Sequence, residues 1–236
     1  MKGITTMNTS MATPGSAMLK PLLIALAAFS ALTLGSASDA FAVAAGQVSN
    51  LSGTLSVKRA DGTSKLLAVK SEVQAGDTLA TEAGTYARVK FIDGGEVVLR
   101  PGSQVKVDAY SYDQAKPADD NQVISLLKGG FRAITGFLGK RNKDKVSYVT
   151  PTATIGIRGT HLGAQLDADN GLHVDVAEGA VVVKNKHGEV QVNVGQFAFV
   201  KSGDEPPTLV VGGKKVEVPQ NIGAGIGKDH DASCSM

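Results

Sequence analysis

The sequence contains no tryptophan, few aromatic residues and only one cysteine, Cys234, close to its C-terminal end. A single cysteine cannot form an internal disulfide, so packing alone must hold the fold together. Cys234 could pair between two chains, but we expect it to belong to a frayed tail. The formal net charge is only +2. This does not indicate a nucleic-acid-binding protein, because such proteins concentrate basic residues on one face.

Motifs of well-known enzyme classes are also lacking. The sequence has no G-x-x-x-x-G-K-[ST] phosphate loop, no G-x-G-x-x-G turn, no H-E-x-x-H and no G-x-S-x-G. Their absence does not exclude an enzyme, but it leaves no residues on which to build a mechanism. We therefore expect a protein that is not an enzyme and that has no catalytic, cofactor-binding or metal-binding residues.

The longest apolar run lies near the N-terminus, over residues 22–34, between Lys20 and the segment Ala40-Phe41-Ala42. A basic residue, an apolar stretch and an A-x-A site form the layout of a secretory signal peptide. We assign residues 1–42 to a leader that is cleaved near Ala42 or Ala44. The alternative is a retained membrane anchor, but the run is shorter than the about 20 residues that a spanning helix needs. We expect a periplasmic or secreted bacterial protein with no stable membrane span after cleavage.

Short runs of alternating apolar and polar residues, separated by turn residues, fill the chain from Gly46 to about Val200. Residues 86–91 and 172–176 are examples, and Asn170-Gly171 indicates a tight hairpin before the second of them. Residues 123–138 are the best helix candidate, but their three glycines favour strand, turn and irregular structure. The sequence thus predicts an all-β domain over 46–200, as a β-roll, a short β-solenoid-like fold or a sandwich-like fold.

The region after this domain, residues 201–236, changes in composition. We expect a linker first, since residues 203–207 read GDEPP. A short hairpin across Gly212-Gly213 would join residues 209–211 to residues 216–218. From Gly223 onward we expect a disordered tail.

Several motifs follow one another inside the predicted β domain. Residues 75–79 read AGDTL, 93–99 read DGGEVVL, 126–131 read LLKGGF, 150–160 read TPTATIGIRGT and 174–179 read VDVAEG. In their order and spacing they resemble the FecR domain, although Gly95 replaces the usual serine and His161 stands where a phenylalanine-containing sequence is common. The signature residues, which we expect to be structural, are Gly76, Asp77, Asp93, Gly94, Thr150, Pro151, Arg158, Gly159, Thr160, Glu178 and Gly179.

The resemblance implies a β-rich roll in the periplasm. In the best-known family members a membrane helix precedes this domain, a cytoplasmic segment controls a sigma factor, and the periplasmic side reads an outer-membrane receptor. We expect the residues before 22 to be too few for such a segment, and those after Val200 too few for a further receptor-contacting domain. The resemblance therefore supports a fold and a compartment better than it supports signalling.

Three weaker patterns could indicate a functional site, but each also has a plain structural explanation. Ser125-x-x-Lys128 matches a penicillin-recognising motif, but its partner tripeptides are absent. Asp167 and Glu178 have the spacing of a Ca²⁺ loop, but the residues between them favour a hairpin. The four histidines, His161, His173, His187 and His230, have no partner at metal-ligand spacing.

Two basic features complete the candidate list. Arg158 could hold backbone carbonyls or a ligand carboxylate with its planar guanidinium, and we expect the structural role. Residues 140–145 contain four cations that could attract anionic polymers, but a solvated loop is expected.

These observations favour a non-enzymatic binding or interaction module. We expect it to recognise an unknown envelope protein or polymer through exposed loops or sheet edges. A membrane-anchored sigma-factor regulator of the FecR type is the alternative. An envelope hydrolase that uses His173 or Asp175 is the second alternative.

Overall fold

The computed structural model describes residues 44–222. The leader assigned to residues 1–42, the tail from Gly223, and the candidates His230 and Cys234 lie outside these residues. The strands are β1 (Ala44–Leu51), β2 (Leu55–Lys58), β3 (Ser64–Leu67), β4 (Glu72–Gln74), β5 (Thr78–Thr81), β6 (Ala87–Phe91), β7 (Glu96–Leu99), β8 (Gln104–Ser111), β9 (Asn121–Lys128), β10 (Gly130–Ile134), β11 (Val146–Val149), β12 (Thr154–Leu166), β13 (Leu172–Asn185), β14 (Gly188–Asn193), β15 (Phe197–Val200) and β16 (Thr208–Val210). The helical elements are α1 (Phe137–Arg141) and the 3₁₀ turns η1 (Pro117–Asp119) and η2 (Lys143–Lys145).

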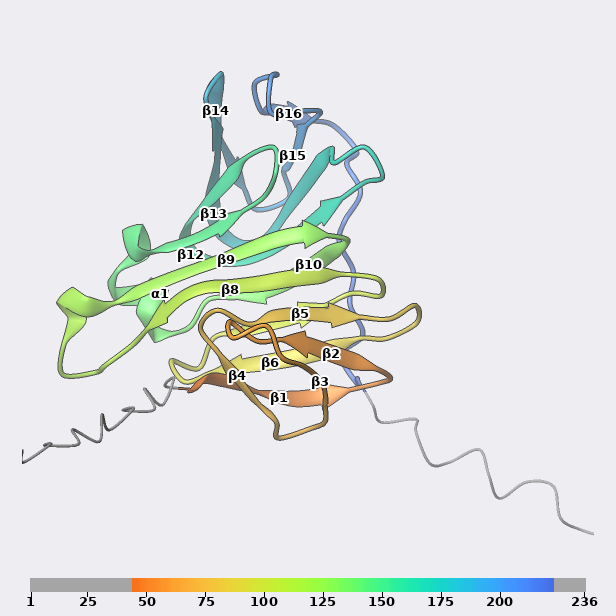
Figure 1. Ribbon diagram of the computed structural model, residues 1–236. Helices are drawn as coiled ribbons and strands as arrows, with labels where there is room; N and C mark the ends of the chain where they lie inside the picture. The colour runs from red at the N-terminus through yellow and green to blue at the C-terminus, as the bar shows by residue number, and fades with distance from the viewer. Residues whose placement is uncertain (1–43, 223–236) are drawn as a thin grey trace, which may run out of the picture. The chain divides into compact units, whose positions relative to one another are not determined.

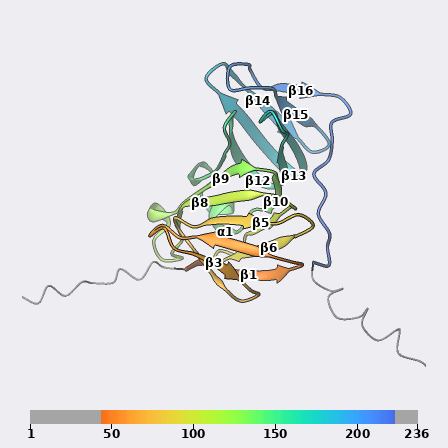
Figure 2. The ribbon, with the colours of Figure 1, turned by 45° about the vertical axis from the view of Figure 1, so that its right-hand side comes forward.

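All the described strands belong to one continuous sheet (Figure 1). Its order is β3-β2-β5-β8-β9-β11-β12-β10-β7-β6-β1-β4, and β13 pairs with β12. The far edge of β13 pairs first with β15 and then with β14. The all-β class predicted from the sequence is confirmed. The expected roll or solenoid is not what forms, because the sheet curls into an open half-barrel (Figures 1 and 2).

The core lies on one face of this curled sheet. In β6, Ala87, Val89 and Phe91 are buried, whereas Arg88 and Lys90 point to the other face, as expected when side chains alternate along a strand. The largest buried side chains include Phe131 and Tyr148, whose ring centroids lie 5.1 Å apart. Burying a side chain of this size stabilises a fold by about 1.5–3 kcal/mol.

The turns follow the local sequence signals in most places. Asn170 has a φ of 64° between β12 and β13, which agrees with the hairpin expected at Asn170-Gly171. Residues 123–138 form β9, the turn at Gly129 and β10 rather than a helix. The one α-helical turn among the described residues, α1, begins at Phe137 and reaches into the basic segment that we expected to be a loop.

The C-terminal hairpin expected across Gly212-Gly213 does not form. β16 pairs with β15 instead. Residues 214–222, here called the strap, contain no strand and run across the sheet (Figure 1). Among the described residues no helix is long and apolar enough to cross a membrane.

Candidate functional site

A row of side chains crosses the outer face of five neighbouring strands, β6, β7, β10, β12 and β13. The pairing register aligns Arg88, Val98, Arg132, Gly163 and Asp175 in this order. Their neighbours in sequence point to the core, because successive side chains of a strand face opposite ways. The row therefore brings two arginines and one aspartate onto the side of the sheet that the core does not use.

Arg132 is the centre of a buried polar cluster on this row. Its side chain is 7% exposed, and that of Asp175 is 4% exposed. Arg132 Nη1 donates to Asp175 Oδ2 at 3.0 Å and to the carbonyl oxygen of Val216 at 2.6 Å. Asp175 Oδ1 accepts the backbone N–H of Val216 at 2.7 Å. The ion pair thus binds both backbone groups of one strap residue, which keeps either charge from being buried without a partner.

The strap crosses the row from β13 toward β1. Beyond Val216, the carbonyl of Gln220 accepts from Arg88 at 3.3 Å and that of Ile222 accepts from Asn50 of β1 at 3.4 Å. Val216 and Ile222 are buried, whereas most strap residues between them are exposed. No hydrogen bond between the strap backbone and another backbone occurs among residues 44–222. Side chains of the sheet therefore hold the strap, and no strand pairing is involved.

Gly163 explains why the strap can lie so close. A Cβ atom at this position would meet Val216 Cβ at 2.6 Å and would also collide with Asp175 Oδ1. Real Cβ atoms do not approach neighbours this closely. Glycine at position 163 is thus required by the approach of the strap to β12.

A cleft of about 530 Å³ lies beside the strap. Its floor is the sheet and one wall is the strap. Ile134, at 44% exposure, is an apolar side chain on this floor. The lining residues from the sheet are Arg88, Glu96, Val98, Arg132, Ile134, His161 and Ala177, and those from the strap are residues 215–220. The volume is in the range of small-ligand sites.

His161 lies at the edge of the cleft and completes the cluster. Its Nε2 accepts a hydrogen bond of 2.8 Å from Arg132 Nε, so the imidazole is neutral and carries its proton on Nδ1. Burial, and then the charge of Arg132, lowers the pKa of His161 below its ordinary value. Asp175 and Glu178 act in the opposite direction, and Lys215 of the strap acts with Arg132.

Most of the signature residues proposed from the sequence occupy turns and bulges away from the cleft. Four of the glycines have positive φ angles, at Gly76, Gly94, Gly159 and Gly179. Thr150 Oγ1 accepts the backbone N–H of Ala153, which closes the turn at Pro151. The hydroxyl groups of Thr160 and Thr135 are hydrogen-bonded, with their oxygens 3.2 Å apart.

The two signature aspartates are buried and bind neighbouring backbone groups. Asp77 accepts the N–H of Gln74 at 2.7 Å and is paired with Arg59. Burial raises the pKa of Asp77, and the hydrogen bond from Gln74 and the charge of Arg59 oppose this. Asp93 accepts the N–H groups of Gly95 and Leu138 and the hydroxyl of Tyr110. Each aspartate therefore fixes a loop.

These two aspartates and the Thr150 turn lie inside one stretch of the chain that matches a known family. Residues 77–182 match the family model described as FecR protein. This part of the chain is a FecR domain. The compact unit that carries it continues on both sides, because the described strands begin at Ala44 and the strap ends at Ile222.

Solved structures similar to the FecR domain were also found. Two crystal structures of a "putative anti-sigma factor" from Parabacteroides distasonis align with 15% and 14% identity and TM-scores of 0.44 and 0.43. Each alignment covers 58% of this chain and 59% of the solved chain. A "cell surface anchoring domain" aligns with 27% identity over 27% of this chain and 83% of its own, with a TM-score of 0.26. No curated protein matches the sequence.

Several sequence candidates are not brought together in the FecR domain. Arg158 and Glu178 are exposed on β12 and β13. The Asp167 carboxylate accepts the N–H groups of Asp169 and Gly171, as a hairpin turn requires, and residues 172–178 are strand. The rings of His173 and Phe199 are tilted against each other with their centroids 4.6 Å apart, and His173 Nε2 lies 3.6 Å from Asp167 Oδ2. Among residues 44–222 no group of three possible metal ligands is found.

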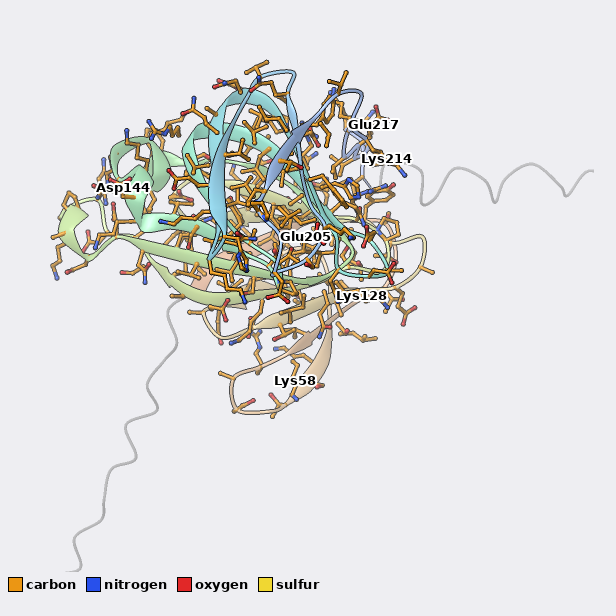
Figure 3. The ribbon with its side chains drawn as sticks, turned by 90° about the horizontal axis from the view of Figure 1, so that it is seen from above. Lys58, Lys128, Asp144, Glu205, Lys214 and Glu217 are labelled. Atoms are coloured by element: carbon orange, nitrogen blue, oxygen red, sulfur yellow. The ribbon has the colours of Figure 1, made fainter. Side chains whose placement is uncertain are left out.

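The remaining two candidates also lie outside the cleft. Ser125 and Lys128 are on β9, and Ser125 Oγ contacts Asp108 Oδ2 at 2.5 Å. The basic segment around Asp144 lies on the opposite side of the FecR domain from Lys214 and Glu217 of the strap (Figure 3). In this segment Arg141 is paired with Asp120, whose pKa the hydrogen bond from Arg141 lowers.

The cleft itself was not found from the sequence. Arg132 is not among the residues predicted from the sequence, and Asp175 is named only for the hydrolase alternative. An arginine inside the apolar segment 131–134 was the available signal, since buried charges are rare unless they are paired. The strap offered no such signal, because its residues 216–218 resemble an ordinary strand.

Proposed function

We propose that this protein is a non-enzymatic binding module of the bacterial cell envelope. Its FecR domain would recognise a partner at the cleft beside the strap. The single observation that carries the proposal is the combination of an apolar floor at Ile134 with charged groups of both signs around it. An open cavity with an apolar floor and a few convergent polar groups is typical of ligand sites.

The chemistry around the cleft supports binding rather than catalysis. Both oxygens of Asp175 already accept hydrogen bonds, from Arg132 and from Val216, and its side chain is 4% exposed, so a substrate has little access to this carboxylate. His161 accepts from Arg132 and lies beside no serine or cysteine nucleophile in the contacts of the described residues. No observation favours the hydrolase alternative.

Export is part of the same proposal. The FecR family faces the periplasm, and the N-terminal layout of a basic residue, an apolar run and Ala40-Phe41-Ala42 supports cleavage of a leader. The partner would then be an envelope protein or polymer. A folded domain without disulfides is compatible with this compartment, because packing and ion pairs hold the described strands.

The experiment is retention of envelope components by the immobilised protein and by two variants. Ile134→Asp places a charge on the floor of the cleft, whereas Leu66→Asp changes an exposed apolar residue of β3, at 70% exposure, that does not line the cleft. We expect a component that the native protein and Leu66→Asp retain and that Ile134→Asp loses. Equal retention by all three proteins, or retention by none, would contradict the proposal.

A second function, control of a sigma factor from the membrane, is favoured by the family match over residues 77–182. It requires the segment 22–34 to stay uncleaved. The intact mass of the protein in separated periplasmic and membrane fractions decides between the two. A soluble periplasmic species that starts near Val43 would exclude the signalling role, and a full-length inner-membrane species would support it.

A further inference from the structure

Two arginines of the cleft hold N–H groups without a partner. Among residues 44–222 three buried side-chain nitrogen atoms make no hydrogen bond, namely Arg88 Nε, Arg100 Nε and Arg132 Nη2. Arg88 and Arg132 line the cleft, and Arg100 does not. A buried donor without an acceptor costs about 1–3 kcal/mol, and more when the group is charged. Two such groups at one cavity therefore indicate a missing acceptor.

The two arginines flank one residue of the strand between them. Arg88 and Arg132 both stand opposite Val98, one on each side of it. Strands lie about 4.8 Å apart, so the two backbones are separated by about 10 Å. The long side chains of Arg88 and Arg132 thus lie on either side of the short side chain of Val98. The space above Val98 is part of the cleft.

Neither arginine is fully used by the protein's own acceptors. Arg88 Nε is 3.7 Å from Glu96 Oε2, which is longer than a hydrogen bond. Arg132 donates hydrogen bonds from Nη1 and Nε. The carbonyl of Val216 offers one oxygen, which accepts from Nη1, so Nη2 has no acceptor. A carboxylate has two oxygens in the geometry that a guanidinium prefers.

The unpartnered N–H groups, and not the net charge, favour an anionic group at one end of an apolar ligand. The lining contains three cations, Arg88, Arg132 and Lys215, and two carboxylates, Glu96 and Glu217, and Asp175 offsets the charge of Arg132. Val98, Ile134 and Ala177 supply apolar surface on the same floor. An end-group carboxylate on a short aliphatic chain matches both features.

We propose that the cleft binds the C-terminal carboxylate of a partner peptide, with Arg88 and Arg132 as its donors and Ile134 beneath its last side chains. This inference rests on the proposed function. The carboxylate would accept from Arg132 Nη2 and from Arg88 in place of the distant Glu96. Recognition of a chain end by fixed donors is a known mode of peptide binding.

The test uses the protein as the cell processes it and two probes, acetyl-Ala-Val-Ala with a free carboxylate and the same peptide as its amide. The N–H signals of the arginine side chains are followed by nuclear magnetic resonance. We expect saturable shifts of the Arg88 and Arg132 signals with the free acid and much smaller shifts with the amide. Equal shifts with both peptides, or none at millimolar peptide, would overturn the proposal.

Three variants separate this site from general damage. Arg88→Gln should weaken binding of the free acid at least about tenfold, because hydrogen bonds between charged groups are strong. Arg100→Gln removes the unsatisfied arginine outside the cleft and should bind like the native protein. Glu96→Gln removes the competing carboxylate and should tighten binding, a gain that structural damage cannot produce.

The outcomes also distinguish this inference from the proposed function. If envelope capture is lost in Ile134→Asp but unchanged in Arg88→Gln, the cleft binds a partner without a carboxylate, and only this inference fails. If neither variant affects capture, the cleft is not the binding site and both proposals fail.

Discussion

Arg132 and Asp175, an ion pair of 3.0 Å buried between β10 and β13, together bind the two backbone groups of Val216. The pair joins the centre of the sheet to a segment more than forty residues further along the chain. It fixes the strap without any strand pairing. The FecR domain and its C-terminal extension are therefore one packed unit at this point.

Removing Arg132 should destabilise the domain strongly. In Arg132→Met the Asp175 carboxylate stays buried without its cation, and breaking a buried pair in this way costs about 3–5 kcal/mol. Urea unfolding measures the loss. Lys186→Met breaks the exposed Lys186–Asp204 pair and should change the free energy of unfolding far less, because solvent screens exposed ion pairs. Similar losses in both variants would show that the buried pair has no special weight.

A methyl group at position 163 should release the strap while leaving most of the sheet intact. In Gly163→Ala the new Cβ meets Val216 Cβ at 2.6 Å, and overpacking of this kind costs about 1–3 kcal/mol. Hydrogen exchange of the Val216 amide, which Asp175 protects in the native protein, should become faster. Gly156→Ala is the matched control in the same strand, because a Cβ at this position would be 3.9 Å from the Val182 carbonyl oxygen, its nearest neighbour. Unchanged exchange in Gly163→Ala would contradict the contact.

The strap should loosen as the pH falls, because of His161. Its pKa in the folded protein lies below its ordinary value, so the unfolded chain binds the proton more readily. The stabilisation is thus fully present above about pH 6.5, the ordinary histidine value. It is lost as the pH falls from there toward the lower pKa of the folded state. Protonation removes the acceptor of Arg132 Nε and sets a second cation beside it and near Lys215, although Asp175 and Glu178 offset part of this.

The melting temperature between pH 8 and pH 5 tests this dependence. The native protein should lose stability over the acid part of the range more steeply than His161→Gln, whose side chain does not titrate. Parallel curves for the two proteins would show that His161 does not contribute. The comparison is needed because carboxylates such as Asp120, whose pKa is lowered by Arg141, also lose stabilisation in acid.

Local patterns predicted the strands and turns well. The alternation in residues 86–91 and the hairpin at Asn170-Gly171 depend on neighbours a few residues apart, and both agree with the structure. The curl of the sheet was not predictable in this way. It depends on which distant strands pair, such as the parallel pair of β9 and β11, and no local pattern encodes that choice.

Local sequence patterns also fail to predict the cleft. Residues 216–218 alternate like a strand, but Asp175 and Arg132 take both backbone groups of Val216 and prevent the expected hairpin. Asp175 and Arg132 lie 41 and 84 residues before Val216 in the sequence. The motif residues Arg158 and Glu178, by contrast, are easy to find in the sequence, but both are exposed and neither contributes a hydrogen bond to the buried cluster of the described chain.

Asp93 should be essential for the loop between β6 and β7. In Asp93→Ala the N–H groups of Gly95 and Leu138 and the Tyr110 hydroxyl lose their acceptor. We expect a loss of at least about 2 kcal/mol in urea unfolding. The pKa of Tyr110, which burial and then Asp93 raise, should fall in an ultraviolet titration. Asp61→Ala, which removes an acceptor of Thr63 in an exposed turn, should lose much less stability than Asp93→Ala.

On the proposed export of the chain, the mature protein should begin at Val43 rather than at Ala45. Ala45 is 1% exposed, and its carbonyl accepts the N–H of Ile92 at 3.0 Å. Cleavage after Ala44 would place the charged α-amino group on this buried residue, and burying an unpaired charge is costly. It would also remove Ala44, which pairs with Gln74 of β4. Cleavage after Ala42 leaves two residues in front of Ala45, so the new amino group is not on the buried residue. Intact mass of the periplasmic protein separates the two starts. A species that begins at Ala45 with unchanged thermal stability would show that β1 tolerates a charged end and that the edge of the sheet is looser than its burial indicates.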